Sequence, residues 1–153
     1  MIQCHMANMT PTEYVVDVLG GPSVFKGRAV PTSIELRARI REGLPYRSFE
    51  SVRERLRLSI PETATVLHMP ARTLARRRQS RKLDPEESDR LYRLARVAAH
   101  AVSAFGEEEK AATWLRRPNR ALNGEPPIHV LDTDIGAQQV EDILGRIEHG
   151  IVA

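Results

Sequence analysis

The side chains best suited to chemistry in this sequence are those of Arg72, Arg76 and Gln79, which recur at i, i+4 and i+7. On a helix this spacing places all three on one face. Arginine can donate two hydrogen bonds to guanine O6 and N7, and glutamine can pair with adenine N6 and N7. The pattern therefore predicts a helix face that reads bases in the major groove of DNA, with neighbouring side chains on phosphates. The predicted DNA-binding set is Arg72, Thr73, Arg76, Arg77, Arg78 and Gln79.

These side chains belong to a segment, residues 60–79, that fits the register of a helix-turn-helix. The motif needs a small residue where its two helices cross, apolar residues on both sides of the turn, and an apolar residue within the second helix. Four residues meet these needs: Ala64, Leu67, Met69 and Leu74. Pro70 at the start of the second helix leaves its amino-terminal end free to enter a groove.

Three positions depart from this motif. His68 stands in the turn, where the backbone usually has a positive φ and the residue is usually glycine. Thr63 and Arg77 stand where apolar residues are commoner. The arginine triplet 76–78 is also compatible with a solvated run of charge, but the register and the local charge favour DNA binding.

The net charge of +3 is the sum of three unequal parts, of which residues 1–27 carry one basic and two acidic side chains, a net charge of −1. Residues 28–82 carry fourteen basic and five acidic side chains, a net charge of +9, whereas residues 83–153 carry eight basic and thirteen acidic ones, a net charge of −5. Of the 23 cations 20 are arginine, which suits bidentate contacts to phosphates and base edges. The asymmetry predicts two modules with different partners: a nucleic-acid-binding module over 1–82 and a second module over 83–153.

The elements that position these side chains are predicted to be helices throughout, in an all-α fold. Residues typical of helix N-caps are Thr10, Thr32, Ser48, Asp84 and Thr133. The predicted helices cover about 11–19, 33–42, 49–56, 85–105, 107–116 and 134–150, with a short helix around 128–131 and two more within 60–79. The apolar residues of the last helix are Ile135, Val140, Ile143, Leu144 and Ile147. No segment shows the period-two alternation of a strand.

The sequence offers no catalytic or metal-binding constellation. Its five histidines lack HxxxH or HExxH spacing, and its one cysteine, Cys4, excludes a disulfide scaffold and a cysteine-rich zinc site. The pair Cys4-His5, the only seed of a catalytic thiol, lies in a terminus expected to fray. The chain is therefore predicted to be no enzyme and to need no cofactor or metal. Without a signal peptide or an apolar run of roughly 18 residues, a cytoplasmic protein is expected.

The last seventy residues resemble the toxin-binding domain of Xre/MbcA/ParS antitoxins. The residues that carry this resemblance are Trp114-Leu115, Pro118-Asn119, Ala121-Leu122, Gly124, Pro127, Leu131-Asp132-Thr133, Gly136, Val140, Leu144 and Arg146–Gly150. Upstream, Val18–Gly21, the arginine-rich helix-turn-helix and Pro85–Leu91 are similar to the Xre antitoxins of RES–Xre toxin–antitoxin pairs. The resemblance covers roughly residues 13–150.

The resemblance implies a protein partner, a RES-domain toxin that is related in fold to ADP-ribosyltransferases and consumes NAD⁺. An antitoxin of this family is expected to neutralise it by covering its active-site cleft. A net charge of −5 suits a cleft that must be positive to bind an anionic dinucleotide. The predicted toxin-binding residues are Trp114, Asn119, Arg146, Glu148, His149, Gly150 and Ile151. Trp114 shares with Leu131, Val140 and Leu144 a helical spacing that is commoner in a domain core.

Together these features predict an antitoxin that binds operator DNA through residues 1–82, binds its toxin through 83–153, and autoregulates its operon. A homodimer, a hetero-oligomer with the toxin, or both are expected, because helix-turn-helix proteins bind two-fold sites in pairs. The alternative is a stand-alone helix-turn-helix repressor whose carboxy-terminal module dimerises or senses a ligand. A third class, a small enzyme, requires titratable residues that only folding brings together.

Overall fold

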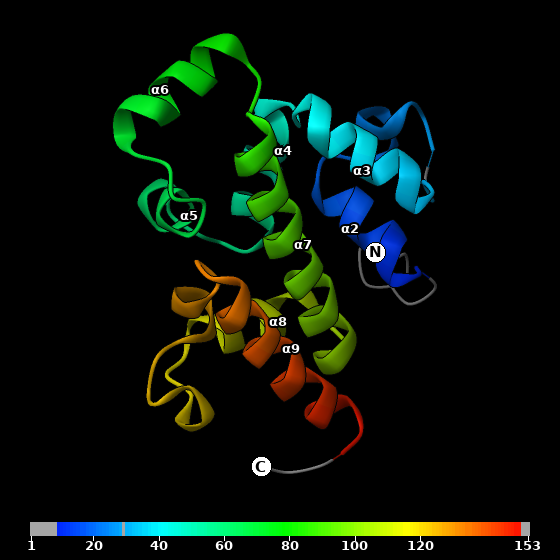
Figure 1. Ribbon diagram of the computed structural model, residues 1–153. Coiled ribbons are helices and arrows are strands. Elements are labelled where there is room, and N and C mark those ends of the chain that lie inside the picture. Colours follow the sequence, from blue (N-terminus) through cyan, green and yellow to red (C-terminus); the bar gives the residue numbers. More distant parts are fainter. Residues whose placement is uncertain (1–8, 29, 151–153) are drawn as a thin grey trace.

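A long helix, α7 (Pro85–Phe105), runs through the middle of the molecule, and most of the other helices pack against it (Figure 1). The computed structural model describes residues 9–28 and 30–150. Asp84 caps α7 as predicted, in a capping box with Glu87, and Gly106 ends the helix with a φ of 80°. Small side chains on its buried face let neighbouring helices approach closely; these are Ala95, Ala98 and Ala101.

The amino-terminal helices pack on one side of α7. They are α2 (Pro11–Val18), the short 3-10 helix η1 (Pro22–Phe25), α3 (Ser33–Glu42) and α4 (Tyr46–Arg55). Thr10 and Thr32 cap α2 and α3 as predicted, each in a capping box. The prediction that Ser48 caps the next helix is wrong, because Ser48 lies fully buried inside α4. Its hydroxyl donates a hydrogen bond to the backbone carbonyl of Leu19 at the end of α2.

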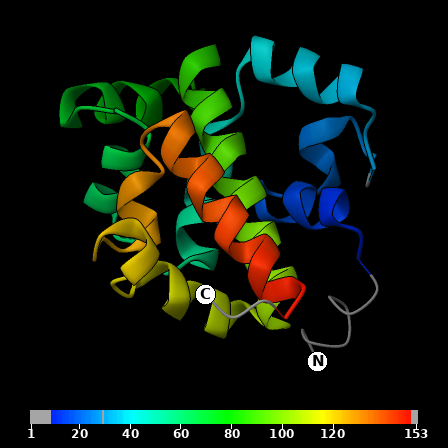
Figure 2. The ribbon, with the colours of Figure 1, turned by 60° about the horizontal axis from the view of Figure 1, so that its bottom comes forward.

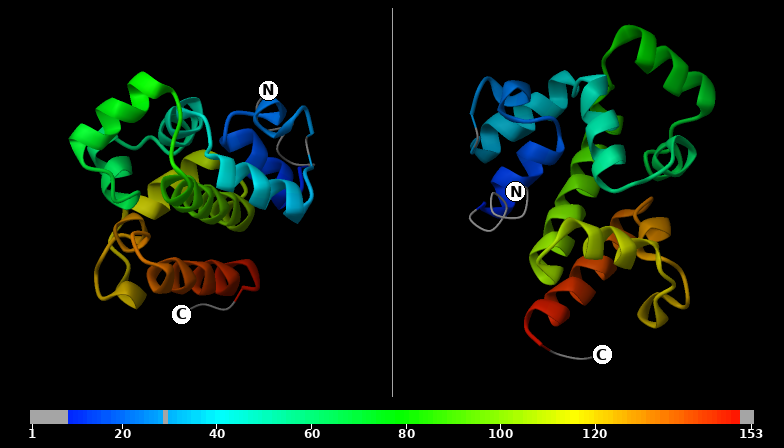
Figure 3. Two further views of the ribbon diagram at one scale, coloured as in Figure 1. Left: turned by 45° about the horizontal axis from the view of Figure 1, so that its top comes forward. Right: turned by 180° about the vertical axis from the view of Figure 1, so that it is seen from behind.

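Two further helices, α5 (Ile60–Val66) and α6 (Ala71–Ser80), form an excursion between α4 and α7. In the views of Figures 1 and 3, α6 lies at the outer edge of the molecule. The chain returns at an isolated antiparallel bridge between Pro45 and Lys82. There the N–H of Tyr46 donates to the carbonyl of Arg81 at 3.0 Å. The bridge thus holds the carboxy-terminal end of the excursion beside the start of α4.

The carboxy-terminal helices cover the other half of α7. They are α8 (Glu108–Arg116), the 3-10 helices η2 (Arg120–Leu122) and η3 (Pro127–Val130), and α9 (Asp134–Glu148). Figure 2 shows α9 lying beside α7. Thr133 caps α9 as predicted, accepting a 3.0 Å hydrogen bond from the N–H of Gly136.

Across residues 9–28 and 30–150 there is no strand beyond the isolated bridge, which confirms the all-α prediction. One hydrophobic cluster includes buried side chains from both sides of Lys82, among them Phe49 and Leu144. The module boundary after Lys82 falls just before α7 and stays a prediction. No helix of the described segments is long and apolar enough to span a membrane.

Candidate DNA-binding and partner-binding surfaces

The turn between α5 and α6 has the left-handed backbone that the helix-turn-helix register requires. His68 has a φ of 53°. The N–H of Met69 donates to the carbonyl of Ala64 at 2.8 Å, and the N–H of His68 donates to Thr65 at 3.1 Å. These two bonds form a Schellman motif, in which the left-handed position is usually held by glycine. The departure from glycine at residue 68 is therefore accommodated without a change of turn geometry.

The apolar positions of the helix-turn-helix pack as predicted. Around the turn the buried side chains are Ala64, Leu67 and Met69. Leu74 of α6 is partly buried against the same core. Thr63 is also fully buried, and its hydroxyl donates to the carbonyl of Ser59 at 2.9 Å. The polar atom at this usually apolar position is thus satisfied within its own helix.

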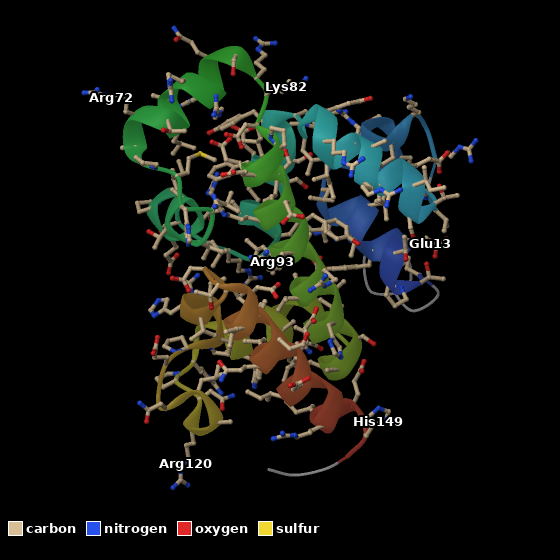
Figure 4. All side chains as sticks on the ribbon, in the orientation of Figure 1. Glu13, Arg72, Lys82, Arg93, Arg120 and His149 are labelled. Atoms are coloured by element: carbon tan, nitrogen blue, oxygen red, sulfur yellow. The ribbon has the colours of Figure 1, made fainter. Side chains whose placement is uncertain are left out.

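The outer side of α6 is exposed. None of the ten residues of α6, all of them within the described chain, is buried. Arg72, Arg76, Arg78 and Gln79 are exposed, and Thr73 is half-buried. Arg72 points away from the molecule in Figure 4. The spacing that predicted a base-reading face is therefore realised on an accessible helix, with cationic side chains available to DNA.

Arg77 faces inward and differs in setting from the other arginines of α6. Its guanidinium lies 3.0 Å from the Asp84 carboxylate and 2.8 Å from that of Glu87, and Glu87 is 5 % exposed. The hydrogen bond to Glu87 raises the pKa of Arg77. This ion pair fastens α6 to the start of α7 and explains why a charged residue replaces the usual apolar one. We therefore place Arg77 among the structural residues and leave it out of the proposed DNA contacts.

Two of the predicted toxin-binding residues lie around and after α8. Trp114 is half-buried, with its ring centroid 5.5 Å from that of Phe105. Asn119 shapes the following loop, because its side-chain oxygen accepts from the N–H of Ala121 at 2.9 Å. Asn119 also accepts a backbone hydrogen bond from Gly124 at 2.9 Å. The geometry thus engages the side chain of Asn119 within the loop and leaves part of Trp114 accessible.

The other predicted toxin-binding residues lie at the end of α9. Arg146, His149 and Gly150 are exposed there. The Glu148 carboxylate instead lies 3.0 Å from His100 Nε2 and accepts from the Ser103 hydroxyl at 2.6 Å, which ties α9 to α7. The hydrogen bond from Ser103, together with that of His100, lowers the pKa of Glu148. Ile151, like Cys4-His5, lies outside the described residues.

Ile135 stands apart from the other apolar residues predicted for the last helix. Its side chain is 75 % exposed in the first turn of α9. The prediction that Leu131, Val140 and Leu144 belong to the domain core is confirmed, because all three side chains are buried. The exposure of Ile135 could have been predicted from the sequence. It precedes Val140 by five positions, whereas residues on the same helix face are three or four positions apart. An exposed isoleucine here is a contact candidate that the sequence reasoning missed.

Gly136 in α9 lies close to the backbone of η3. A Cβ atom at this position would lie 1.7 Å from the backbone carbonyl oxygen of Val130. We expect Gly136→Ala to lower the free energy of unfolding by about 2 kcal/mol or more, because overpacking against backbone outweighs the better helix propensity of alanine. Urea unfolding followed by circular dichroism measures this change.

Gly145 in the same helix is the matched control for that substitution. A Cβ atom there meets nothing within 4 Å. Gly145→Ala should therefore raise the unfolding free energy by about 0.5–1 kcal/mol. Equal effects of the two substitutions would contradict the close approach at Gly136.

Contacts around Arg55 join the helix-turn-helix half to the carboxy-terminal half. Its guanidinium lies 2.6 Å from the carboxylate of Glu108 in α8 and 3.0 Å from that of Asp17 in α2. It also lies 5.6 Å from the centroid of the Tyr14 ring, and the Tyr14 hydroxyl donates to Glu108 at 2.6 Å. Burial first, and then the hydrogen bond to Glu108, raise the pKa of Tyr14. Three helices thus meet at one half-buried cation.

In the part of the chain that the structure describes, no three histidine, cysteine or acidic side chains gather as metal ligands. The described surfaces include a cationic helix, α6, and a carboxy-terminal helix, α9, with an exposed isoleucine in its first turn.

These surfaces define a helix-turn-helix protein with a carboxy-terminal protein-binding module. The antitoxin Xre-like helix-turn-helix domain model matches residues 35–96, and the antitoxin Xre/MbcA/ParS C-terminal toxin-binding domain model matches residues 100–150. The chain belongs to the Xre family of antitoxins.

Known relatives agree with this membership. The chain is 37 % identical to antitoxin Xre of Photorhabdus laumondii over 120 residues, which cover 77 % of this chain and 81 % of the relative. It is 35 % identical to antitoxin Xre of Pseudomonas putida, over 78 % of this chain and 74 % of the relative. A chain from the crystal structure of the M. tuberculosis MbcT-MbcA toxin-antitoxin complex superposes with a TM-score of 0.52 and 25 % identity, covering 69 % of this chain and 94 % of that one.

Proposed function

We propose that this antitoxin neutralises a RES-domain toxin that consumes NAD⁺, by covering the toxin's active-site cleft, and that it binds operator DNA to repress its own operon. The observation that carries the first part is the toxin-binding domain match over residues 100–150. Similarity to a chain from a toxin–antitoxin complex also supports a toxin as the partner. The RES class of the partner rests on the sequence resemblance.

The proposed toxin-facing surface combines two parts of α9. One is its carboxy-terminal end, where Arg146 and His149 are exposed. The other is the exposed Ile135 at its first turn. The net charge of −5 over residues 83–153 complements a cleft that must attract an anionic dinucleotide. An apolar anchor within a charged surface is the arrangement expected of a protein interface.

The proposed DNA-facing surface is the outer side of α6. Its proposed base contacts are Arg72, Arg76 and Gln79, with Thr73 beside them and Arg78 on phosphate. All of them precede Lys82 and all proposed toxin contacts follow it, so the predicted division after Lys82 separates the two functions. Both activities in one chain allow the antitoxin to repress its operon.

Co-expression with a RES-domain toxin encoded beside this chain tests the proposal. The full chain should restore growth and cellular NAD⁺, whereas the Arg146→Ala/His149→Ala double variant should lose most of this protection. The variant leaves Glu148 in place, so that the contact between α9 and α7 is kept. The matched control is Lys26→Ala/Arg47→Ala, which removes two exposed cations in the amino-terminal half, away from every predicted toxin-binding residue, and should protect fully.

Two results would count against the proposal. Failure of the full chain to protect would favour a stand-alone repressor over an antitoxin of a RES-domain toxin. Full protection by the Arg146→Ala/His149→Ala variant would remove the end of α9 from the toxin interface.

A further inference from the structure

The arginines of α3, which precedes the helix-turn-helix, have two different settings. Arg39 is held by the protein, because its Nε donates to the carbonyl of Val24 at 2.7 Å and its Nη1 to that of Gly43 at 2.9 Å. Arg37 and Arg41 are exposed and enter none of the ion pairs of the described chain. They lie four positions apart, so they share one face of the helix. α3 therefore offers two cations to a partner, as α6 does.

The carboxy-terminal end of α3 is joined to the segment that follows α6. A Cβ atom at Gly43, the residue after α3, would lie 3.0 Å from Cε of Lys82. The N–H of Leu83 donates to the carbonyl of Leu44 at 2.9 Å. Arg41 stands two residues before Gly43, so these contacts place it beside the end of α6.

The segment between α6 and α7 adds two more cations at this junction. Arg81 and Lys82 are exposed, and neither takes part in an ion pair of the described chain. Arg81 follows α6 with a left-handed backbone, at a φ of 61°. Figure 4 shows Arg72 and Lys82 near the two ends of α6. Accessible cations therefore extend from the recognition helix through residues 81–82 to α3.

An open groove of about 620 Å³ between α3 and α7 continues this surface. Of the charged side chains that line it, four are arginines, Arg37 and Arg41 among them, and two are carboxylates, Glu86 and Asp89. Each carboxylate forms an ion pair with an arginine of α7, at 3.8 Å and 3.6 Å. The groove is therefore positive, and its excess charge belongs to the two arginines of α3.

A continuous row of accessible cations favours a polyanion as the partner of α3. Residues 28–82 carry a net charge of +9, and arginine suits phosphates because it can donate two parallel hydrogen bonds. Ile34 is 69 % exposed and would suit a protein, but it lies in the first turn of α3, the end remote from Lys82. The observations favour the backbone of the same DNA whose bases α6 is proposed to read.

We infer that Arg37, Arg41, Arg81 and Lys82 form a second, phosphate-binding surface, which holds the DNA backbone beside the bases read by α6. This inference rests on the proposed operator binding and extends it to a helix outside α5 and α6. Phosphate contacts carry no sequence information, so this surface should raise the affinity for every sequence alike. The base contacts of α6 determine the sequence preference, and the two contributions can therefore be measured separately.

Titration of the full chain at several salt concentrations tests this surface, with DNA from upstream of the gene and a scrambled duplex of the same length. Arg37→Ala/Arg41→Ala removes two phosphate contacts, so the slope of log K against log salt concentration should become shallower by about two. Between about 50 and 200 mM salt, this variant should lose about tenfold less affinity than the native chain. The ratio of its affinities for the two duplexes should stay native. Arg37→Lys/Arg41→Lys keeps both charges and should keep the native slope.

The control is Arg117→Ala/Arg120→Ala, which removes two exposed cations in the carboxy-terminal half and should keep both the slope and the ratio. Circular dichroism should show native helix content in every variant. An unchanged slope in Arg37→Ala/Arg41→Ala would overturn the surface and leave α3 to a protein partner, while operator binding through α6 would stand. A changed ratio would overturn it by making α3 a reader of bases. A native chain that binds neither duplex would overturn both this surface and the proposed operator binding.

Discussion

Replacing Arg72 and Arg76 together with alanine is expected to abolish specific binding of operator DNA. Both side chains are exposed on the outer side of α6, one turn apart. Each bidentate contact to guanine contributes about 1–3 kcal/mol of discrimination, so the double variant should lose about 2–6 kcal/mol and its sequence preference. Titration of labelled DNA from upstream of the gene, at one fixed salt concentration, measures the loss.

Two neighbouring arginines serve as matched comparisons for that measurement. Arg78→Ala removes an exposed cation assigned to phosphate, so it should weaken all sequences alike and reduce the salt slope by about one. Arg77→Ala removes the ion pairs to Asp84 and Glu87, so it should lower thermal stability. Unchanged affinity of the Arg72→Ala/Arg76→Ala variant would remove α6 from the DNA interface.

The features that could be predicted from sequence are those that depend on neighbours within a few residues. Asp84 and Thr133 cap their helices because a capping side chain bonds to a backbone N–H only two or three positions away. The positive φ of His68 could be predicted because the two hydrogen bonds of the Schellman motif join residues at the end of α5 that are at most five positions apart. The helix-turn-helix and the all-α fold could therefore be predicted from residue types and their spacing along the chain.

The features that could not be predicted depend on partners far along the chain. Ser48 has the chemistry of an N-cap, but its hydroxyl bonds to Leu19, 29 residues away. At the start of α4 it is the backbone N–H of Tyr46 that donates a hydrogen bond to the carbonyl of Arg81. Arg77 meets Asp84 and Glu87 only because α6 folds back toward α7. The predicted helix of the candidate site is present, and Arg77 pairs with α7 on its inner side.

Removal of the Arg55 side chain should cause the largest loss of stability among the surface arginines. The side chain is 27 % exposed and bridges carboxylates of α2 and α8. Truncating one partner of a buried ion pair costs about 3–5 kcal/mol, and partial exposure reduces this to about 2–3 kcal/mol here. Glu108 keeps the Tyr14 hydroxyl as a donor but loses its cation. Urea unfolding of Arg55→Ala measures the change.

Arg57→Ala is the matched control, because Arg57 also reaches α8 but through an exposed pair. Its guanidinium lies 3.4 Å from Glu109, with both side chains about two-thirds exposed, so its removal should cost less than about 1 kcal/mol. A double-mutant cycle of Arg55→Ala and Glu108→Ala isolates the energy of the pair itself. If Arg55→Ala and Arg57→Ala cost the same, the joint between the two halves must rest on apolar packing along α7 and not on this cation.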